Sequence, residues 1–519
     1  MSSPLRVDGR RMISNLTNFE WNYDHAAHLA SRCIMGATRD EISALFDIGR
    51  TQGVEAAVDS LVGRAEDWGD FPFPDWWDGK EISAGGPTGS INDSESRFVH
   101  WYLEQLHVAN PLGAKMFKFF VDHVPISKKP LLHQNKWIYF FQHFDLCRKH
   151  SLGNFKELIH GVSWSGGMMW TLDLKSNSRP RLNENFGREL LELFTLGVNG
   201  GYTEEDVLNT AKAFTGRRTE AKHPEDHPYT PYLDDTYSIK FPEKFYLIDT
   251  AEKIILGKTF PKISPGQGDV SEHGSAVMDH IFEQPAAGTY LVWKLWRYFV
   301  APEPPEELVA KLGNRFKNSH NFEIRPLLKD IFMSRAFYDT KNRGNQIKDA
   351  ADFMVSCLKN LKVSEPEPAL TWPALYFLGY DPMDPPSIAG WAEPEGVGNS
   401  WLGLEKALFR SNLPSLWLQE TIGFLPVYDD LTYRSIRDID PPGDFKIKNI
   451  IPAHLQEPEN LDLLIDELND HFLPFHRISS KQRAVLIEGY EKDFRQLNVE
   501  TRIRELIRIF MALPEFQLQ

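Results

Sequence analysis

The chain has 519 residues, of which 42% are hydrophobic and 25% are charged, and its formal net charge is −15. This length is enough for one large domain or two to three ordinary domains with a well-buried core. The acidic surplus excludes a general nucleic-acid binder, because phosphate contacts need a surplus of basic residues. Cys33, Cys147 and Cys357 stand far apart, which excludes a disulfide framework and a cysteine-based zinc site of local spacing.

Neither a membrane span nor a targeting segment is visible in the sequence. No run of apolar residues is long enough to cross a bilayer. Arg10 and Arg11 lie near the start but no apolar stretch follows them, so residues 1–21 do not resemble a signal peptide. As written, the sequence predicts a cytoplasmic protein unless a leader has been removed.

Helical periodicity dominates the chain, so the expected fold class is mainly α, a large multi-helix body. Helices are predicted at Tyr23–Ser31, Thr38–Leu45, Val54–Val62, Glu95–Val108, Pro111–Val121, Asn135–Lys149, Asn154–Val162, Asn183–Leu196, Thr203–Phe214, Ser275–Phe282, Thr289–Phe299, Glu306–Phe316, Ile324–Met333, Gly344–Leu361, Trp401–Arg410, Leu461–His471, Ser480–Gly489 and Val499–Met511. Thr38 with Glu41 has the spacing of a capping box. Long loops rich in Pro, Gly and Trp are expected at 67–92 and 379–400.

The segment 217–268 differs in composition from the rest, being rich in Pro, Tyr, Asp and Gly. Tyr246-Leu-Ile and Lys253 to Phe260 predict two short strands or a hairpin there. We therefore expect a small β-containing insertion at 217–268 between an N-terminal helical part, 1–216, and a C-terminal helical part, 269–519. The three parts are expected to form one compact unit.

The segment Asn183–Gly197 carries the most chemistry. Asn183 suits a helix N-cap, and Gly197 suits the left-handed residue that ends a helix. Glu184, Arg188 and Glu192 follow one another on one side of the predicted helix, and Glu189 lies closer to its apolar stripe. Carboxylates on a helix edge present metal ligands or general bases in many helical enzymes, whereas the alternative is an ion-pair ladder on a solvated face.

The same segment resembles a bacterial family known as domain of unknown function 1800. The resemblance rests on the run Asn183 to Gly197, on Tyr202 to Val207, on Ala211 to Gly216, and on Lys294 to Phe299, Pro385 to Trp391 and Leu513 to Phe516. It extends over nearly the whole chain but implies little chemistry, because the family has no established activity. Its members are often exported and encoded beside sulfatase-like proteins, which suggests a sulfatase-like partner and work on polysaccharide.

Two departures from the family pattern concern histidines. The family usually has two histidines after the Asn-Pro-Leu helix, whereas this chain has Val121 at one position and keeps His123. A second family histidine is replaced by Ile248, beside Asp249. If these positions bind a divalent metal in relatives, His123 and Asp249 are the candidate ligands that remain here.

The leading interpretation is an enzyme that uses Glu184, Arg188, Glu189 and Glu192, with or without a divalent metal, on a polar substrate such as a carbohydrate. Asn183, Asn185, Trp391 and Trp401 are the candidate substrate-binding residues, because amides and loop tryptophans recognise sugars. The alternative is a non-catalytic binding or partner protein. Carboxylates facing a cavity with His123 would favour the enzyme, and the same groups paired with Arg188 in solvent would favour the alternative.

Overall fold

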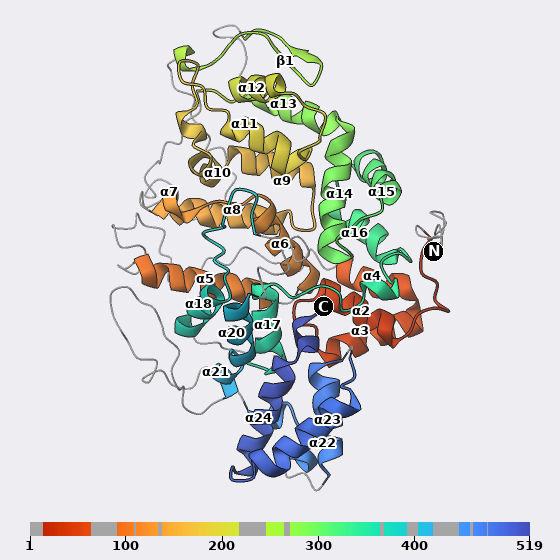
Figure 1. Ribbon diagram of the computed structural model, residues 1–519. Helices are drawn as coiled ribbons and strands as arrows, with labels where there is room; N and C mark the ends of the chain where they lie inside the picture. Colours follow the sequence, from red (N-terminus) through yellow and green to blue (C-terminus); the bar gives the residue numbers. More distant parts are fainter. Residues whose placement is uncertain are drawn as a thin grey trace, which may run out of the picture.

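The structure is a computed structural model that describes residues 14–63, 91–107, 110–132, 137–216, 245–263, 270–363, 368–391, 403–418, 446–456, 460–474 and 476–519. In this part of the chain the fold is mainly α, as predicted, with one two-stranded sheet (Figure 1). No helix among the described residues has the length and apolar character that crossing a membrane requires. The predicted loop at 67–92 lies almost wholly outside the described residues.

The first helices are α2 (Tyr23–Cys33), α3 (Arg39–Gln52) and α4 (Val54–Val62), and capping side chains begin α2 and α3. Thr38 and Glu41 form the predicted capping box at the start of α3, where the Thr38 amide donates to the Glu41 carboxylate at 2.8 Å. The other helices are α5 (Ile91–His107), α6 (Pro111–His123), α7 (Lys128–Leu132), α8 (Trp137–Lys149), α9 (Phe155–Trp164), α10 (Gly166–Thr171), α11 (Asn185–Glu189), α12 (Glu204–Ala213), α13 (Val270–Glu283), α14 (Pro285–Phe299), α15 (Glu306–Asn318), α16 (Ile324–Met333), α17 (Ala350–Asn360), α18 (Pro368–Phe377), α20 (Leu404–Asn412), α21 (Ser415–Leu418), α22 (Leu461–Phe472), α23 (Ser480–Glu488) and α24 (Val499–Ala512).

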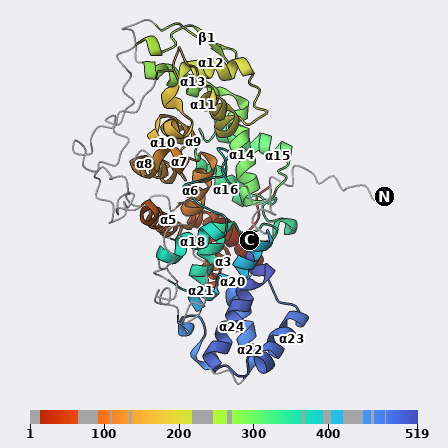
Figure 2. The same ribbon diagram turned by 60° about the vertical axis from the view of Figure 1, so that its left-hand side comes forward.

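These helices form an elongated body in both views (Figures 1 and 2). Helices α11 to α13 and the hairpin lie at one end, and α22 to α24 lie at the other. Helices from the two halves of the sequence interleave between these ends: α4 packs against α16, α5 against α17 and α18, and α3 against α22. The core therefore joins segments from both halves of the chain.

The hairpin consists of β1 (Lys253–Ile255) and β2 (Lys258–Phe260), which pair antiparallel with Lys253 opposite Phe260. Leu256 and Gly257 form its two-residue turn, both with positive φ, which is the backbone that tight hairpins require. The predicted strand at Tyr246 was wrong, because this residue belongs to a 3-10 helix, Phe245–Leu247. Among the described residues of 217–268, the strand pairing lies at 253–260.

Candidate functional site

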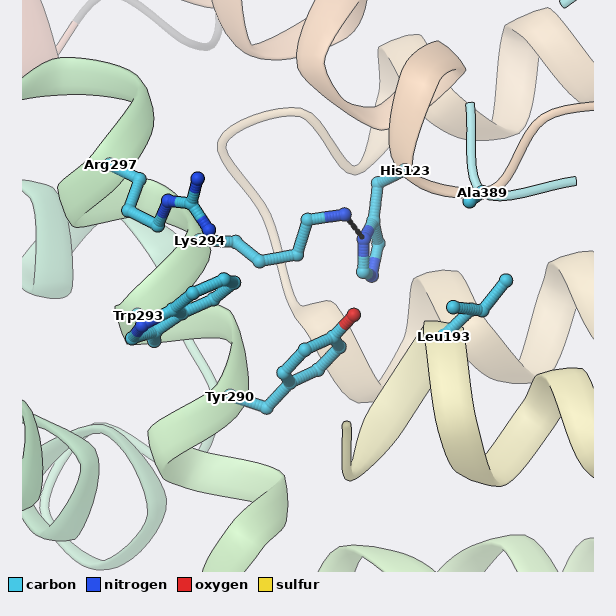
Figure 3. A pocket seen from close by; sticks show the side chains of 7 residues that line it. All are labelled: His123, Leu193, Tyr290, Trp293, Lys294, Arg297 and Ala389. Carbon is cyan, nitrogen blue, oxygen red and sulfur yellow. Dashed lines mark hydrogen bonds between the residues drawn. The ribbon is translucent and has the colours of Figure 1, made fainter. Parts of the chain in front are cut away.

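A pocket of about 270 Å³ lies where the end of α6, the helix α14, the segment after α11 and the loop before Trp391 meet. Its lining residues are His123, Leu193, Tyr290, Trp293, Lys294, Arg297 and Ala389 (Figure 3). The described lining thus combines two cationic groups with an imidazole, a phenol and an indole.

His123 is the last residue of α6 and is only 2% exposed. Its Nε2 lies 3.1 Å from the carbonyl oxygen of Phe194, and its Nδ1 lies 3.1 Å from the Lys294 ammonium (Figure 3). Because a carbonyl only accepts and an ammonium only donates, Nε2 carries the proton and Nδ1 is the acceptor. Burial and the Lys294 charge hold the pKa of His123 well below its usual value, so the ring is neutral.

Helix α14 supplies four of the lining side chains from one face. Tyr290, Trp293, Lys294 and Arg297 have the spacing i, i+3, i+4 and i+7, which places them side by side along the helix. The Arg297 guanidinium lies over the Trp293 ring, 4.3 Å from its centroid. Stacking on the indole restricts this long side chain and keeps its donors at the pocket.

The predicted helix Asn183–Leu196 has an unexpected second half. Helix α11 ends at Glu189, and the next residues, Leu190–Thr195, form a π-helix. At the end of this π-helix, the Leu196 amide donates to the Leu191 carbonyl at 2.9 Å. Gly197 then adopts the predicted left-handed conformation, with φ of 82°. A Cβ at Gly197 would lie 2.7 Å from the Tyr290 ring, so glycine also permits Tyr290 to pack here.

The wall that contains Ala389 depends on a second close approach. Gly390 has φ of 83°, and a Cβ there would lie 2.0 Å from the carbonyl oxygen of Asp122 at the end of α6. Trp391 packs beside it against Tyr380, with ring centroids 4.9 Å apart. The loop is thereby fixed on α6 next to His123.

The family model described as "Protein of unknown function (DUF1800)" matches residues 28–518. The chain belongs to this family. The match confirms the resemblance seen in the sequence and includes every residue of the pocket. No curated protein and no solved structure is similar enough to the chain to be matched with it.

The charged residues of the DUF1800 helix α11 do not line the pocket. Arg188 donates to both carboxylate oxygens of Glu204 on α12, at 2.9 and 2.6 Å, and lies 3.5 Å from Glu184. The Arg188, Glu184 and Glu204 side chains are 34%, 44% and 77% exposed. This solvent-facing ion pair is the arrangement that the sequence associated with a binding or partner protein.

Glu189 and Glu192 lie on the same helical segment and are both partly buried. Partial burial, together with the Glu192 charge, raises the pKa of Glu189. Burial and the nearby charge of Glu192 raise the pKa of Tyr202 to about 12. Neither Glu189 nor Glu192 is among the lining residues of the pocket.

The predicted substrate-binding residues are placed in three different ways. The Asn183 side chain accepts from the Asn185 amide at 3.0 Å, but the N-cap of α11 is Glu184, so the N-cap predicted at Asn183 was wrong by one residue; Asn185 is exposed. Trp391 is half-buried next to the pocket wall. Trp401 lies outside the described residues.

The predicted metal ligands are engaged with other groups. Asp249 lies next to the hairpin, 3.1 Å from the ammonium of Lys253, and His123 is bound by Phe194 and Lys294. Val121 and Ile248, at the positions of the expected DUF1800 histidines, are both buried. The described residues contain no group of three or more metal-ligating side chains, and the metal site stays a prediction.

The four α14 residues were not predicted as a group from the sequence. Lys294 and Arg297 entered only as part of a DUF1800 motif. The signal that would have found them is the polar and aromatic face of Tyr290, Trp293, Lys294 and Arg297 on an otherwise apolar helix. Charged side chains on one face of a helix whose other sides are buried must be solvated, so this face is expected to lie at the surface or to line a pocket.

Proposed function

We propose that the protein binds a small anionic ligand, an acidic or sulfated sugar unit, in the pocket between His123, Lys294 and Arg297. The observation that carries the proposal is the convergence of two cationic side chains on one pocket of about 270 Å³. This volume is close to the lower end of ligand pockets, roughly 300 Å³, and suits a single sugar ring.

The two cations differ in what they contribute. Arg297, stacked on Trp293, offers a planar set of donors that matches a carboxylate or sulfate in two parallel hydrogen bonds. Lys294 adds a second donor with a compact charge, and its ammonium lies 3.1 Å from Nδ1 of His123. An anion that contacts both is stabilised more than the same anion in water, because part of its solvation shell is replaced by fixed donors.

The rest of the lining suits the uncharged part of such a ligand. Leu193 and Ala389 offer apolar contact, and the Tyr290 hydroxyl is directed toward His123 (Figure 3). A sugar has both hydroxyls and an apolar C–H face, so it can use both kinds of contact. A sulfated sugar would also fit work beside a sulfatase-like partner, which stays a prediction.

Calorimetric titration with sodium glucuronate, sodium sulfate and uncharged glucose tests the proposal. Glucuronate and sulfate are expected to bind and glucose to bind much more weakly. Lys294→Met or Arg297→Met should weaken glucuronate binding by about 10- to 100-fold, the usual effect of losing a charge-assisted hydrogen bond. Lys311→Met, on the exposed face of α15, is the matched control and should bind as the wild type does. Equal binding of glucose and glucuronate, or binding of neither anion, contradicts the proposal.

The carboxylate-based enzyme is the second candidate, because Glu189 has a raised pKa beside Glu192. A general acid needs such a carboxyl group, and Glu189 is the residue of the segment that best meets this condition. Turnover of a glycoside by the wild type that is lost in Glu189→Gln but kept in Glu184→Gln would support it. Elemental analysis of the wild type and of His123→Ala tests the divalent metal: near-stoichiometric metal that disappears in the variant would establish it.

A further inference from the structure

We propose that the segment Leu190–Gly197 serves the pocket through its backbone: the Phe194 carbonyl fixes the ring of His123, and His123 holds the Lys294 ammonium toward the ligand. His123 is then a positioning residue that acts through Lys294. This inference rests on the proposed function. It assigns a role to the motif that the sequence singled out for its carboxylates.

The first step is the Phe194 carbonyl. Phe194 is buried in the last turn of the π-helix, where carbonyl groups lack the partners that they have inside a helix. A buried carbonyl without a donor is costly, and the Nε2–H of His123 satisfies it at 3.1 Å. π-helical turns are rare and concentrate at functional sites. Here the turn directs a backbone acceptor at a pocket residue.

The second step is the tautomer. With the proton held on Nε2, the Nδ1 lone pair faces Lys294 at 3.1 Å. The other tautomer would place an N–H against the ammonium and a lone pair against the carbonyl, two repulsive contacts. The Phe119 ring stacks parallel to the imidazole, 5.8 Å away, and Phe155 packs at the same distance, so the ring has little freedom to turn.

The third step is the lysine itself. A lysine has a flexible four-carbon stem, and restricting it on ligand binding costs conformational free energy. An acceptor already in place restricts the stem before the ligand arrives. The same backbone segment also sets the neighbouring tyrosine, because Gly197 leaves no side chain to displace Tyr290.

The experiment compares His123→Asn with His123→Phe, using glucuronate and sulfate as probes. The Oδ1 of asparagine lies one bond beyond Cγ, as Nδ1 does, so it can still accept from Lys294. Phenylalanine keeps the ring and removes both hydrogen bonds. We expect His123→Phe to bind the probes about 10-fold more weakly than the wild type. His123→Asn keeps the acceptor for Lys294 but loses the donor to the Phe194 carbonyl, so we expect a smaller loss, of about 3-fold.

His143 provides the matched control. It is equally buried, and its Nε2 lies 2.7 Å from a backbone carbonyl, that of Val124, while within the described residues its Nδ1 has no partner. His143→Phe should therefore lower the thermal midpoint without changing probe affinity. The inference would be overturned if a folded His123→Phe variant bound the probes as tightly as the wild type. It would also be overturned if the Asn and Phe variants were weakened equally. Either result would leave the proposed function intact.

A second pair of variants keeps the test decisive if His123→Phe does not fold. Gly197→Ala and Gly201→Ala place a side chain on left-handed backbone with φ of 82° and 85°, but only Gly197 has Tyr290 in the way. Gly197→Ala should weaken probe binding and Gly201→Ala should not. If the two variants bind the probes with equal affinity, the proposed role of the Leu190–Gly197 backbone is contradicted. If the wild type binds neither probe, both this inference and the proposed function are contradicted.

Discussion

The ammonium of Lys118 lies 3.1 Å from a carboxylate oxygen of Asp349, although both side chains are buried. Lys118 is on α6, one turn before the pocket residue His123, and Asp349 is the N-cap of α17. Asp122 contacts the same ammonium at 2.6 Å, and its side chain faces Tyr380, which packs on Trp391. One lysine thus joins α6, α17 and the loop that forms the pocket wall.

Lys118→Met is expected to destabilise the protein strongly, because it leaves the carboxylates of Asp122 and Asp349 without their shared cation. Removing one partner of a buried ion pair usually costs about 3–5 kcal/mol of unfolding free energy. Urea unfolding followed by circular dichroism measures the change. Lys129→Met is the control, since Lys129 is 77% exposed and should change stability by less than about 0.5 kcal/mol. Similar midpoints for both variants would contradict the expectation.

Asp349 is expected to contribute to acid denaturation. Burial raises its pKa, but Lys118, the Asp352 amide and Lys115 outweigh burial and lower it below 3.8. Because the folded pKa is below the unfolded one, the stabilisation is complete above 3.8 and is lost as the pH falls through the folded pKa. Asp349→Asn keeps a side chain that can serve as an N-cap but removes the carboxylate that titrates. The unfolding free energy of this variant should therefore depend less on pH below about 4 than that of the wild type. Urea midpoints across acid pH test this, and an unchanged slope would refute it.

Gly390→Ala is expected to displace the loop from α6, because the new Cβ would lie 2.0 Å from the Asp122 carbonyl oxygen. The substitution should lower stability by more than the roughly 1 kcal/mol that left-handed backbone alone costs a side chain. Gly257→Ala, with φ of 77° and no atom within 4 Å, isolates that backbone cost. Differential scanning calorimetry of the two variants gives the comparison. If Gly257→Ala is the less stable variant, the close approach at Gly390 is not decisive.

Cys33, Cys147 and Cys357 are free and buried, and burial raises the pKa of each thiol. A buried, protonated thiol is a poor nucleophile. Native protein is therefore expected not to react with Ellman's reagent at neutral pH over minutes, and all three cysteines should react in guanidinium. Absorbance measures both states. Rapid reaction of a thiol in the native protein would show that its side chain is reached by solvent.

By itself the sequence determined the local structure. Val54–Val62 and Ile324–Met333 are helices with the predicted bounds, the Thr38 capping box forms, and Gly197 is left-handed. These features depend on hydrogen bonds and steric limits within a few residues, so periodicity and capping side chains are enough to predict them. The π-helix was missed because its apolar residues Leu190, Leu193 and Phe194 fit an α-helical stripe equally well.

Only the tertiary structure decided which polar groups meet. Arg188 has carboxylates four residues away on both sides, at Glu184 and Glu192, yet it forms its closest pair with Glu204 on the next helix. Lys294 meets His123 from 171 residues further along the chain. Side-chain spacing within one helix gives the direction in which a group points but not what lies there. That depends on how α6, α14 and the π-helix pack, and packing is settled by burial over the whole core.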